Sequence, residues 1–286
     1  MSGVRLALDG KTALISGGSR GIGAETVRLF VEAGARVAFS YRAARGRAEA
    51  LVNECGGDRC VAIEQELGSP EDGRALVRRA VAALGRLDIL VANHGIWEPG
   101  DALIEQMSEA QWRRTLGVNL DAVFGLVQEA VGVMLGKHGG QESAVTAGRE
   151  TGGTTGLEPG ATSSGATAKG HIVLISSTAG QRGEAYHADY AVTKGALVSL
   201  TKSLSTELAP KGIMVNCVAP GWVHTDMSAA TLADAELGAK IGAGIPVGRV
   251  ATPREIAGPV LFLCTPLAGF ISGEILNVNG GAVLVG

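Results

Sequence analysis

The stretch TALISGGSRGIG, residues 12–23, decides the fold. Residues 12–16 are apolar enough to predict a buried strand, and Gly17, Gly21 and Gly23 then follow in the spacing G-x-x-x-G-x-G, where a helical pattern at 22–33 begins. Glycine allows a sharp turn and lets a pyrophosphate approach the backbone amides, and the helix N-terminus adds unpaired N–H groups. A plain glycine turn is the alternative, since the chain holds 43 glycines. The strand before and the helix after favour a phosphate-binding loop.

Outward from this loop, strand patterns alternate with helical patterns. Apolar, β-branched runs predict further strands at 36–40, 60–64, 88–92, 171–176, 214–219 and 275–278, and helical patterns occupy 72–84 and 190–208. The alternation predicts an α/β fold: a single Rossmann-fold domain over residues 1–286, with a doubly wound parallel sheet of about seven strands and helices on both faces. Such a sheet binds ligands at the carboxyl ends of its strands, so we expect the functional site there.

Composition narrows the classes of partner. A net charge of -3 and a pI near 6.0 give no general attraction to nucleic acid or to anionic membranes, so neither partner is expected. Cys55, Cys60, Cys217 and Cys264 form no C-x-x-C pair or ligand cluster, so we expect reduced thiols and no metal site, with a Cys55–Cys60 bridge as the alternative. No signal peptide and no apolar stretch of roughly 18 residues is evident, which predicts a cytoplasmic location.

Tyr190 and Lys194 are spaced to share one face of a helix, thirteen residues after Ser177. A free tyrosine titrates near ~10, and a neighbouring cation favours the phenolate and lowers that pKa. The pair therefore predicts an acid/base group that works near neutral pH. A buried tyrosine and a solvated lysine that merely share a helix are the alternative.

Over nearly its whole length, apart from one insertion, the chain resembles the short-chain dehydrogenase/reductase family. The landmarks occur in the family's order: SGGSRGIG at 16–23, ANHG at 92–95, Asn119 in GVNL, Ser177 with Tyr190-x-x-x-Lys194, PGWVHT at 220–225 and GEILNVNGG at 273–281. Each landmark alone is weak, and their common order and spacing make the resemblance specific.

The resemblance implies a catalytic tetrad of Asn119, Ser177, Tyr190 and Lys194, and hydride transfer between a nicotinamide and a carbonyl or alcohol carbon. Ser177 would orient the substrate oxygen, and Tyr190 would give that oxygen its proton or take it back. Lys194 would lower the pKa of the tyrosine and hold the nicotinamide ribose, and Asn119 would fix a water that links Lys194 to solvent. The expected cofactor contacts are Gly17, Ser19, Arg20, Gly21, Ile22, Gly23, Tyr41, Arg42, Glu66, Leu67, Asn93, Gly95, Tyr190, Lys194, Pro220, Gly221, Val223 and Thr225.

Some positions have alternatives or depart from the family pattern. Asn119 could instead cap the helix that follows, Ser176 is a rival to Ser177, and Tyr186 reads as a wall of the substrate pocket or a packing residue. The departures are Ser16 for threonine, Ala92 and His94 for asparagine and alanine, Glu66 for an aspartate that contacts adenine, and Asn279 for aspartate. We interpret His94 as a packed or hydrogen-bonded residue rather than a catalytic one.

The end of the second strand, FSYRAAR, bears on the choice of cofactor. An acidic residue there would bind the ribose 2′-hydroxyl, and this chain has Tyr41 and Arg42 instead, with Arg20 in the glycine loop and Arg45 beyond. A guanidinium pairs with phosphate through two parallel hydrogen bonds, so we predict NADP(H) over NAD(H). A solvated basic turn is the alternative.

Two segments concern the substrate. Residues 138–170 form an insertion rich in Gly, Ser and Thr, which predicts a flexible surface loop, with a loop of specific function as the alternative. Residues 225–247 predict a mobile, largely apolar lid. Trp97, Trp222 and Met227 would add apolar walls. The resemblance is closest to the 3-oxoacyl-carrier-protein reductases of fatty acid biosynthesis. In that group two basic positions help to dock the acyl carrier; here the insertion occupies the first position, and Lys211 matches the second, so carrier docking is only half supported.

Other functions remain open at this level. An alcohol, sugar or steroid dehydrogenase shares many of the same segments, and a non-catalytic cofactor-binding regulator or a scaffold protein is a further alternative. The family resemblance also implies a homotetramer, with the long catalytic helix and the C-terminal strand near the interfaces.

Overall fold

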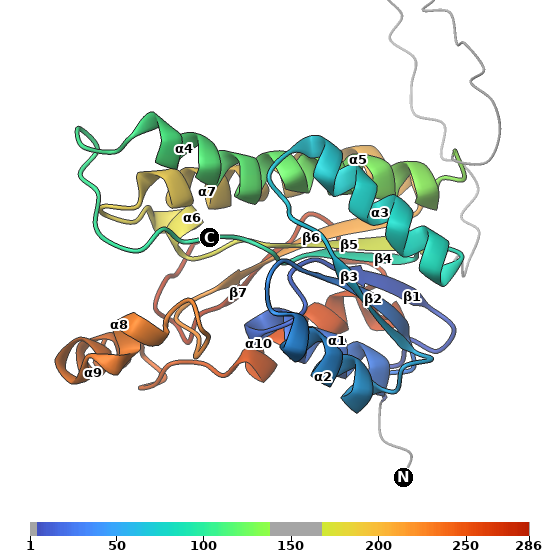
Figure 1. Ribbon diagram of the computed structural model, residues 1–286, viewed down its shortest axis with the longest axis horizontal. Helices are drawn as coiled ribbons and strands as arrows, with labels where there is room; N and C mark the ends of the chain where they lie inside the picture. The colour runs from blue at the N-terminus through green and yellow to red at the C-terminus, as the bar shows by residue number, and fades with distance from the viewer. Residues whose placement is uncertain (1–4, 138–167, 286) are drawn as a thin grey trace, which may run out of the picture.

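A seven-stranded parallel sheet forms the centre of the molecule (Figure 1). The computed structural model describes residues 5–137 and 168–285. The strand order is β3-β2-β1-β4-β5-β6-β7. The strands are β1 (Thr12–Ile15), β2 (Arg36–Tyr41), β3 (Cys60–Glu64), β4 (Ile89–Ala92), β5 (Gly170–Ile175), β6 (Ile213–Pro220) and β7 (Ile275–Val278). The predicted doubly wound sheet is confirmed, and each predicted strand agrees to within one residue at either end.

Helices cover both faces of this sheet, as Figure 1 shows. On one face lie α3 (Pro70–Leu84), α4 (Glu109–Leu116), α5 (Ala122–Met134), α6 (Ala179–Arg182) and α7 (Ala188–Leu208). On the other lie α1 (Gly21–Glu32), α2 (Arg45–Cys55) and α10 (Pro253–Leu263). Two apolar clusters, one on each face, make the core, so the central strands read as continuous apolar runs rather than alternating ones.

Local sequence signals set the ends of several helices. Ser69 caps α3 by accepting from the Asp72 N–H, Pro70 occupies its first turn, and Gly85 ends it in a left-handed conformation with φ of 85°. A capping box between Thr252 and Glu255 starts α10. Of these ends, the left-handed Gly85 turns the chain toward β4, which begins at Ile89.

The helix α5 continues α4 through a π-helical turn, η1 (Gly117–Asp121). The continuous helix Glu109–Met134 is long and apolar enough on average to cross a membrane, although the sequence contains no unbroken apolar run of that length. Half of the apolar window is buried inside the protein, and α5 packs against α3. The segment is a half-buried core helix, not a membrane span.

The two segments singled out for the substrate differ in what the structure describes. The insertion at 138–170 lies outside the described residues except for 168–170, where β5 begins. The lid contains two short helices, α8 (Ala229–Ala233) and α9 (Ala235–Ala243), which project from the body beyond the sheet (Figure 1). Neither helix has a buried residue.

Candidate active site

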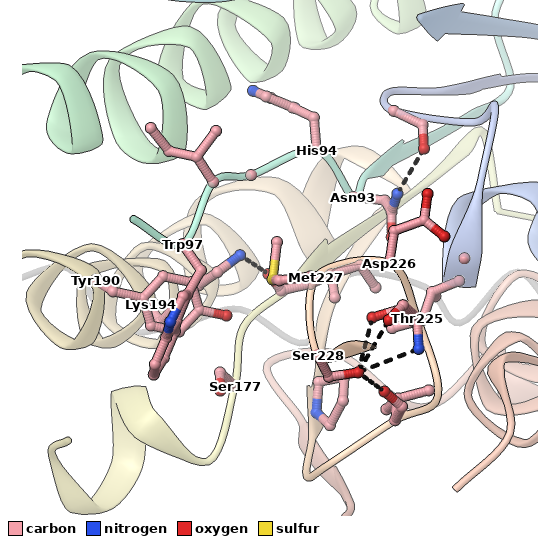
Figure 2. A pocket seen from close by; sticks show the side chains of 18 of the residues that line it. Asn93, His94, Trp97, Ser177, Tyr190, Lys194, Thr225, Asp226, Met227 and Ser228 are labelled. Atoms are coloured by element: carbon pink, nitrogen blue, oxygen red, sulfur yellow. Dashed lines mark hydrogen bonds between the residues drawn. The ribbon is translucent and has the colours of Figure 1, made fainter. Parts of the chain in front are cut away.

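A cleft of about 320 Å³ opens at the carboxyl ends of the strands, where the strand order reverses between β1 and β4. The loops that follow β1, β2, β4, β5 and β6 all contribute to its walls, and Figure 2 shows how their side chains converge. Segments far apart in the sequence therefore meet in one cavity, at the position expected for a doubly wound sheet.

The glycine loop between β1 and α1 packs too closely for side chains. A Cβ on Gly23 would lie 2.2 Å from the Gly17 carbonyl oxygen, and a Cβ on Gly17 would lie 3.0 Å from the His94 Cα. Gly17 and Gly21 have φ of 67° and 56°, a region that favours glycine. No side chain caps the N-terminus of α1 and its first turn carries no acidic residue, so its N–H groups are free to bind an anion. These features fit the pyrophosphate of a dinucleotide.

Most of the predicted cofactor residues line this cleft. They are Gly17, Ser19, Arg20, Gly21, Ile22, Tyr41, Arg42, Leu67, Asn93, Gly95, Tyr190, Lys194, Pro220, Gly221, Val223 and Thr225. Two predicted contacts are not on the cleft wall. Gly23 lies behind it, where its close approach to Gly17 packs helix against strand, and Glu66 is exposed while Gln65 and Leu67 line the cleft. Successive extended residues point to opposite sides, which turns Glu66 away.

The end of β2 closes the cleft near the glycine loop. The Gly17 N–H donates to the Ser40 hydroxyl at 3.0 Å, and Arg42 lines the cleft. Arg45 instead pairs with Glu49 at 2.9 Å on the exposed side of α2, as the solvated-turn alternative describes.

Asp226, at the start of the lid, reaches across to the glycine loop. It pairs with Arg20 at 3.4 Å and with Arg47, and the hydrogen bond from Arg47 holds the pKa of its carboxyl below the usual range. Sequence reasoning missed this contact, because Arg20 and Asp226 lie 206 residues apart.

Ser177, Tyr190 and Lys194 meet in the same cleft (Figure 2). Ser177 follows β5, its hydroxyl accepts from the Ala179 N–H at 3.1 Å, and it lies near enough to Tyr190 to lower the pKa of that phenol. The Lys194 Nζ lies 5.6 Å from the centre of the Tyr190 ring and donates to the Ile175 carbonyl at 2.8 Å. The neighbouring Ser176 hydroxyl donates to the Lys194 carbonyl at 2.7 Å, which leaves Ser177 as the serine that faces the tyrosine.

The expected lowering of the Tyr190 pKa by Lys194 is not what this structure gives. Burial raises the pKa of Tyr190 to about 12, the hydrogen bond with Ser177 opposes the rise, and the charge of Glu184 adds to it. Burial also lowers the pKa of Lys194 to about 8, so the lysine holds its charge less firmly near neutral pH. In this state Tyr190 is a protonated phenol at neutral pH, ready to donate a proton.

Asn119 lies in the π-helical turn η1 and is fully buried. Its side-chain oxygen accepts from the Ile96 N–H at 2.8 Å, and its amide donates to the Ile96 carbonyl at 2.9 Å and to Thr193 at 3.3 Å. The alternative that Asn119 caps the following helix is wrong, because α4, η1 and α5 run on without a break. A Cβ on Gly95 would lie 3.3 Å from the Asn119 oxygen and 3.4 Å from the Lys194 Nζ, so Asn119 and Lys194 flank the same glycine.

Aromatic residues flank the tyrosine. The Trp97 ring lies 4.8 Å from that of Tyr190, edge-on, and 3.8 Å from that of His187. Trp97, Trp222 and Met227 line the cleft as predicted. Tyr186 does not line the cleft, so its prediction as a pocket wall is wrong, and its half-exposed side chain leaves the packing alternative.

Arg182 and Glu184 also line the cleft, and no sequence motif pointed to them. They form an ion pair of 2.9 Å on the segment between Ser177 and Tyr190. The substrate end of the cleft is therefore less apolar than the sequence suggested.

Comparison with known proteins agrees with this geometry. Residues 11–148 match the family described as short chain dehydrogenase, and residues 159–283 match the family described as Enoyl-(Acyl carrier protein) reductase. A 3-oxoacyl-[acyl-carrier-protein] reductase of Vibrio cholerae is 34% identical over 97% of this chain and 99% of its own length.

Two solved structures share the fold over nearly the whole chain. A 3-ketoacyl-(acyl-carrier-protein) reductase from Brucella melitensis, complexed with NADH, has a TM-score of 0.79 at 28% identity and covers 97% of this chain and 100% of its own. A putative NAD(P) dependent gluconate 5-dehydrogenase from Beutenbergia cavernae with bound NADP has a TM-score of 0.79 at 33% identity, covering 98% and 99%.

Proposed function

Since the chain belongs to the short-chain dehydrogenase/reductase family, we propose that it reduces a 3-oxoacyl thioester or a similar hydrophobic ketone with NADP(H). The family membership itself makes the protein an oxidoreductase that acts on CH–OH groups with an NAD(P) cofactor. The observation that carries the proposal is the meeting of Ser177, Tyr190 and Lys194 in the cleft that the uncapped N-terminus of α1 also lines. One end of that cleft suits a dinucleotide and the other presents a proton donor to a carbonyl oxygen.

The residues of the chain then divide the chemistry among them. When bound, the nicotinamide supplies the hydride for reduction or accepts it for oxidation. Ser177 holds the carbonyl oxygen, and Tyr190, protonated at neutral pH, gives that oxygen its proton as negative charge develops there. Lys194 has a pKa of about 8 and can return a proton to Tyr190 after each turnover. Asn119 lies beside Lys194, across Gly95, on the route by which that proton would arrive.

Two observations support NADP(H) as the cofactor. Arg20 and Arg42 both line the cleft, and no acidic residue stands at the end of β2. We expect wild-type kcat/KM to favour NADPH over NADH, and Arg42→Ala to reduce that preference by about tenfold or more, because a hydrogen bond between charged groups is lost. Arg45→Ala is the matched control, since Arg45 pairs with Glu49 outside the cleft. A wild-type preference for NADH contradicts the proposal.

The substrate proposal rests on the walls near Tyr190. Ile96, Trp97, Trp222 and Met227 offer apolar surface for an acyl chain. A sugar dehydrogenase is the second candidate, because Arg182 and Glu184 add charged hydrogen-bonding groups to the same cleft. Lys211 is exposed just beyond the end of α7, where it pairs with Glu207 at 3.2 Å and stays accessible to an acidic carrier.

A panel of carbonyl substrates with NADPH, followed by nicotinamide absorbance, tests the proposed function. It includes 3-oxoacyl thioesters, simple cyclic ketones, keto sugars and a steroid ketone, and we expect the highest kcat/KM with the thioesters. A clear preference for keto sugars would contradict the thioester proposal and favour a sugar dehydrogenase. An absence of turnover with every substrate would indicate a regulator or a scaffold.

We further propose a homotetramer in the cytoplasm. Phe124 on α5 and Val192 on α7 are half-exposed apolar side chains, and α5 and α7 both pack against η1, which suits contact with a second copy of the chain. Sedimentation analysis tests the assembly, and a monomer at micromolar concentration overturns it.

A further inference from the structure

His94 bridges two parts of the site that the tetrad does not connect. Its Nδ1 lies 2.7 Å from the Ser16 hydroxyl at the end of β1, and its Nε2 lies 2.9 Å from the Val118 carbonyl in η1. In Figure 2 the His94 side chain points away from Tyr190 and toward the helical layer. His94 lines the cleft but forms its hydrogen bonds with Ser16 and Val118 rather than with Ser177, Tyr190 or Lys194, so its contacts need another explanation.

The partners of the ring settle which nitrogen carries the proton. A carbonyl oxygen accepts hydrogen bonds only, so the nitrogen that faces Val118 must be an N–H. Burial lowers the pKa of His94 to about 4, with the charge of Lys194 contributing, so the ring is neutral at pH 7 and Nδ1 has a free lone pair. Ser16 then donates to Nδ1, while the Ser16 oxygen accepts from the Asn93 N–H at 3.0 Å. The hydrogen bonds run in one direction, from Asn93 through Ser16 and His94 to Val118.

The carbonyl at the end of this chain belongs to the turn that carries Asn119. In a regular α-helix the Ala122 N–H would donate to the Val118 carbonyl, but here it donates to Gly117, one residue earlier. The Val118 carbonyl has thus lost its α-helical donor, and the His94 Nε2–H supplies one in its place. A turn of this kind needs such compensation, since an unpaired buried carbonyl is costly.

We propose that His94 is a positioning residue, whose Nε2–H holds the Val118 carbonyl and so fixes the π-helical turn that directs Asn119 toward Ile96 and Thr193. The inference rests on the proposed function in one respect, namely that Asn119 serves catalysis. Asn119 makes three side-chain hydrogen bonds in this position, and each depends on the register of the turn. Ser16 orients the imidazole, which explains why serine and histidine occur together at positions 16 and 94.

Replacing His94 by glutamine or by asparagine tests its hydrogen bond to Val118 separately from its hydrogen bond with Ser16. Gln is long enough to keep a donor near the position of Nε2, whereas Asn keeps only an acceptor near the position of Nδ1. We expect His94→Asn and His94→Ala to lower kcat about tenfold, because the free energy of one ordinary hydrogen bond corresponds to about that factor in rate. We expect His94→Gln to lower kcat no more than about threefold. In an Asn119→Ala background, His94→Ala should lower kcat less than about twofold further, because the two residues act as one unit.

Equal losses in the Asn and Gln variants, or a full tenfold loss in the Asn119→Ala background, overturn the proposal. The Asn and Gln variants remain informative if the alanine variant does not fold. Nitrogen chemical shifts of His94 at pH 7 give a readout that needs no turnover: we expect a neutral ring protonated at Nε2. The opposite tautomer refutes the inference, whereas an inactive wild type with the expected tautomer refutes only the proposed function.

Discussion

The tetrad and the lid face the same cleft but are held in different ways. Asn119, Tyr190 and Lys194 are at most 7% exposed, and each is held by hydrogen bonds or ring contacts with a neighbouring loop or strand. The lid, residues 225–247, carries α8 and α9 without a buried residue, and Met227 in it is 49% exposed. The proposed catalytic groups are thus fixed by packing, while the proposed lid carries two helices without a buried residue and is the less stable of the two regions.

Tyr190→Phe is the most severe test of the tetrad side. The ring and its packing on Trp97 remain, but the proton donor is gone, so we expect kcat to fall by about 10²–10⁴-fold with cofactor affinity nearly unchanged. Steady-state kinetics and fluorescence titration with NADPH measure the two quantities. Tyr186→Phe is the control, since that hydroxyl lies outside the cleft. Activity retained in Tyr190→Phe refutes the mechanism.

Two carboxylates, one beside the tetrad and one in the lid, test how much each region contributes to the free energy of unfolding. Asp189 is buried beside Tyr190 and accepts from Thr115 at 2.7 Å and from Gln111 at 3.2 Å, whereas Asp234 caps the exposed helix α9. We expect Asp189→Ala to lower the free energy of unfolding by about 2–4 kcal/mol, because it leaves buried donors unpaired. Asp234→Ala should lower it by about 1 kcal/mol at most. Urea unfolding measures both, and similar losses would remove the contrast between the regions.

Sequence patterns predicted the strands because both faces of the sheet are covered. Strands buried on both faces require continuous apolar runs, and such runs are visible without knowledge of the partners. The glycine loop was equally readable, since the crowding at Gly23 excludes every other residue. These features depend on local requirements of the backbone.

Features that depend on distant partners could not be read in this way. The raised pKa of Tyr190 follows from burial by several elements, and the π-helical turn at Asn119 accompanies a bond from His94, which belongs to another loop. The contact between Arg20 and Asp226 joins two loops that lie 206 residues apart in the sequence. Spacing along the chain carries no information about such contacts, so the sequence predicted which side chains meet in the cleft but not the contacts that set their pKa values.

The lid side is tested by a smaller change at its base. Ser228 is buried, accepts from the Thr225 N–H at 3.2 Å and donates to the Val223 carbonyl, so it fastens the lid to the loop after β6 (Figure 2). Because α8 and α9 add no buried residue, we expect Ser228→Ala to shift the lid toward open states and raise KM about three- to fivefold, as the loss of one hydrogen bond implies.

The value of kcat decides what the lid does. Among the described residues, Ser228 forms its hydrogen bonds with Val223 and Thr225 and not with the tetrad. We therefore expect kcat to stay within about twofold while KM rises, which is the signature of lost binding rather than lost chemistry. Thr206→Ala removes a hydroxyl on the exposed side of α7 and serves as the matched control. A fall in kcat as large as the rise in KM would mean that the lid also aligns the substrate with Tyr190, and the two regions would then have to be treated as one catalytic unit.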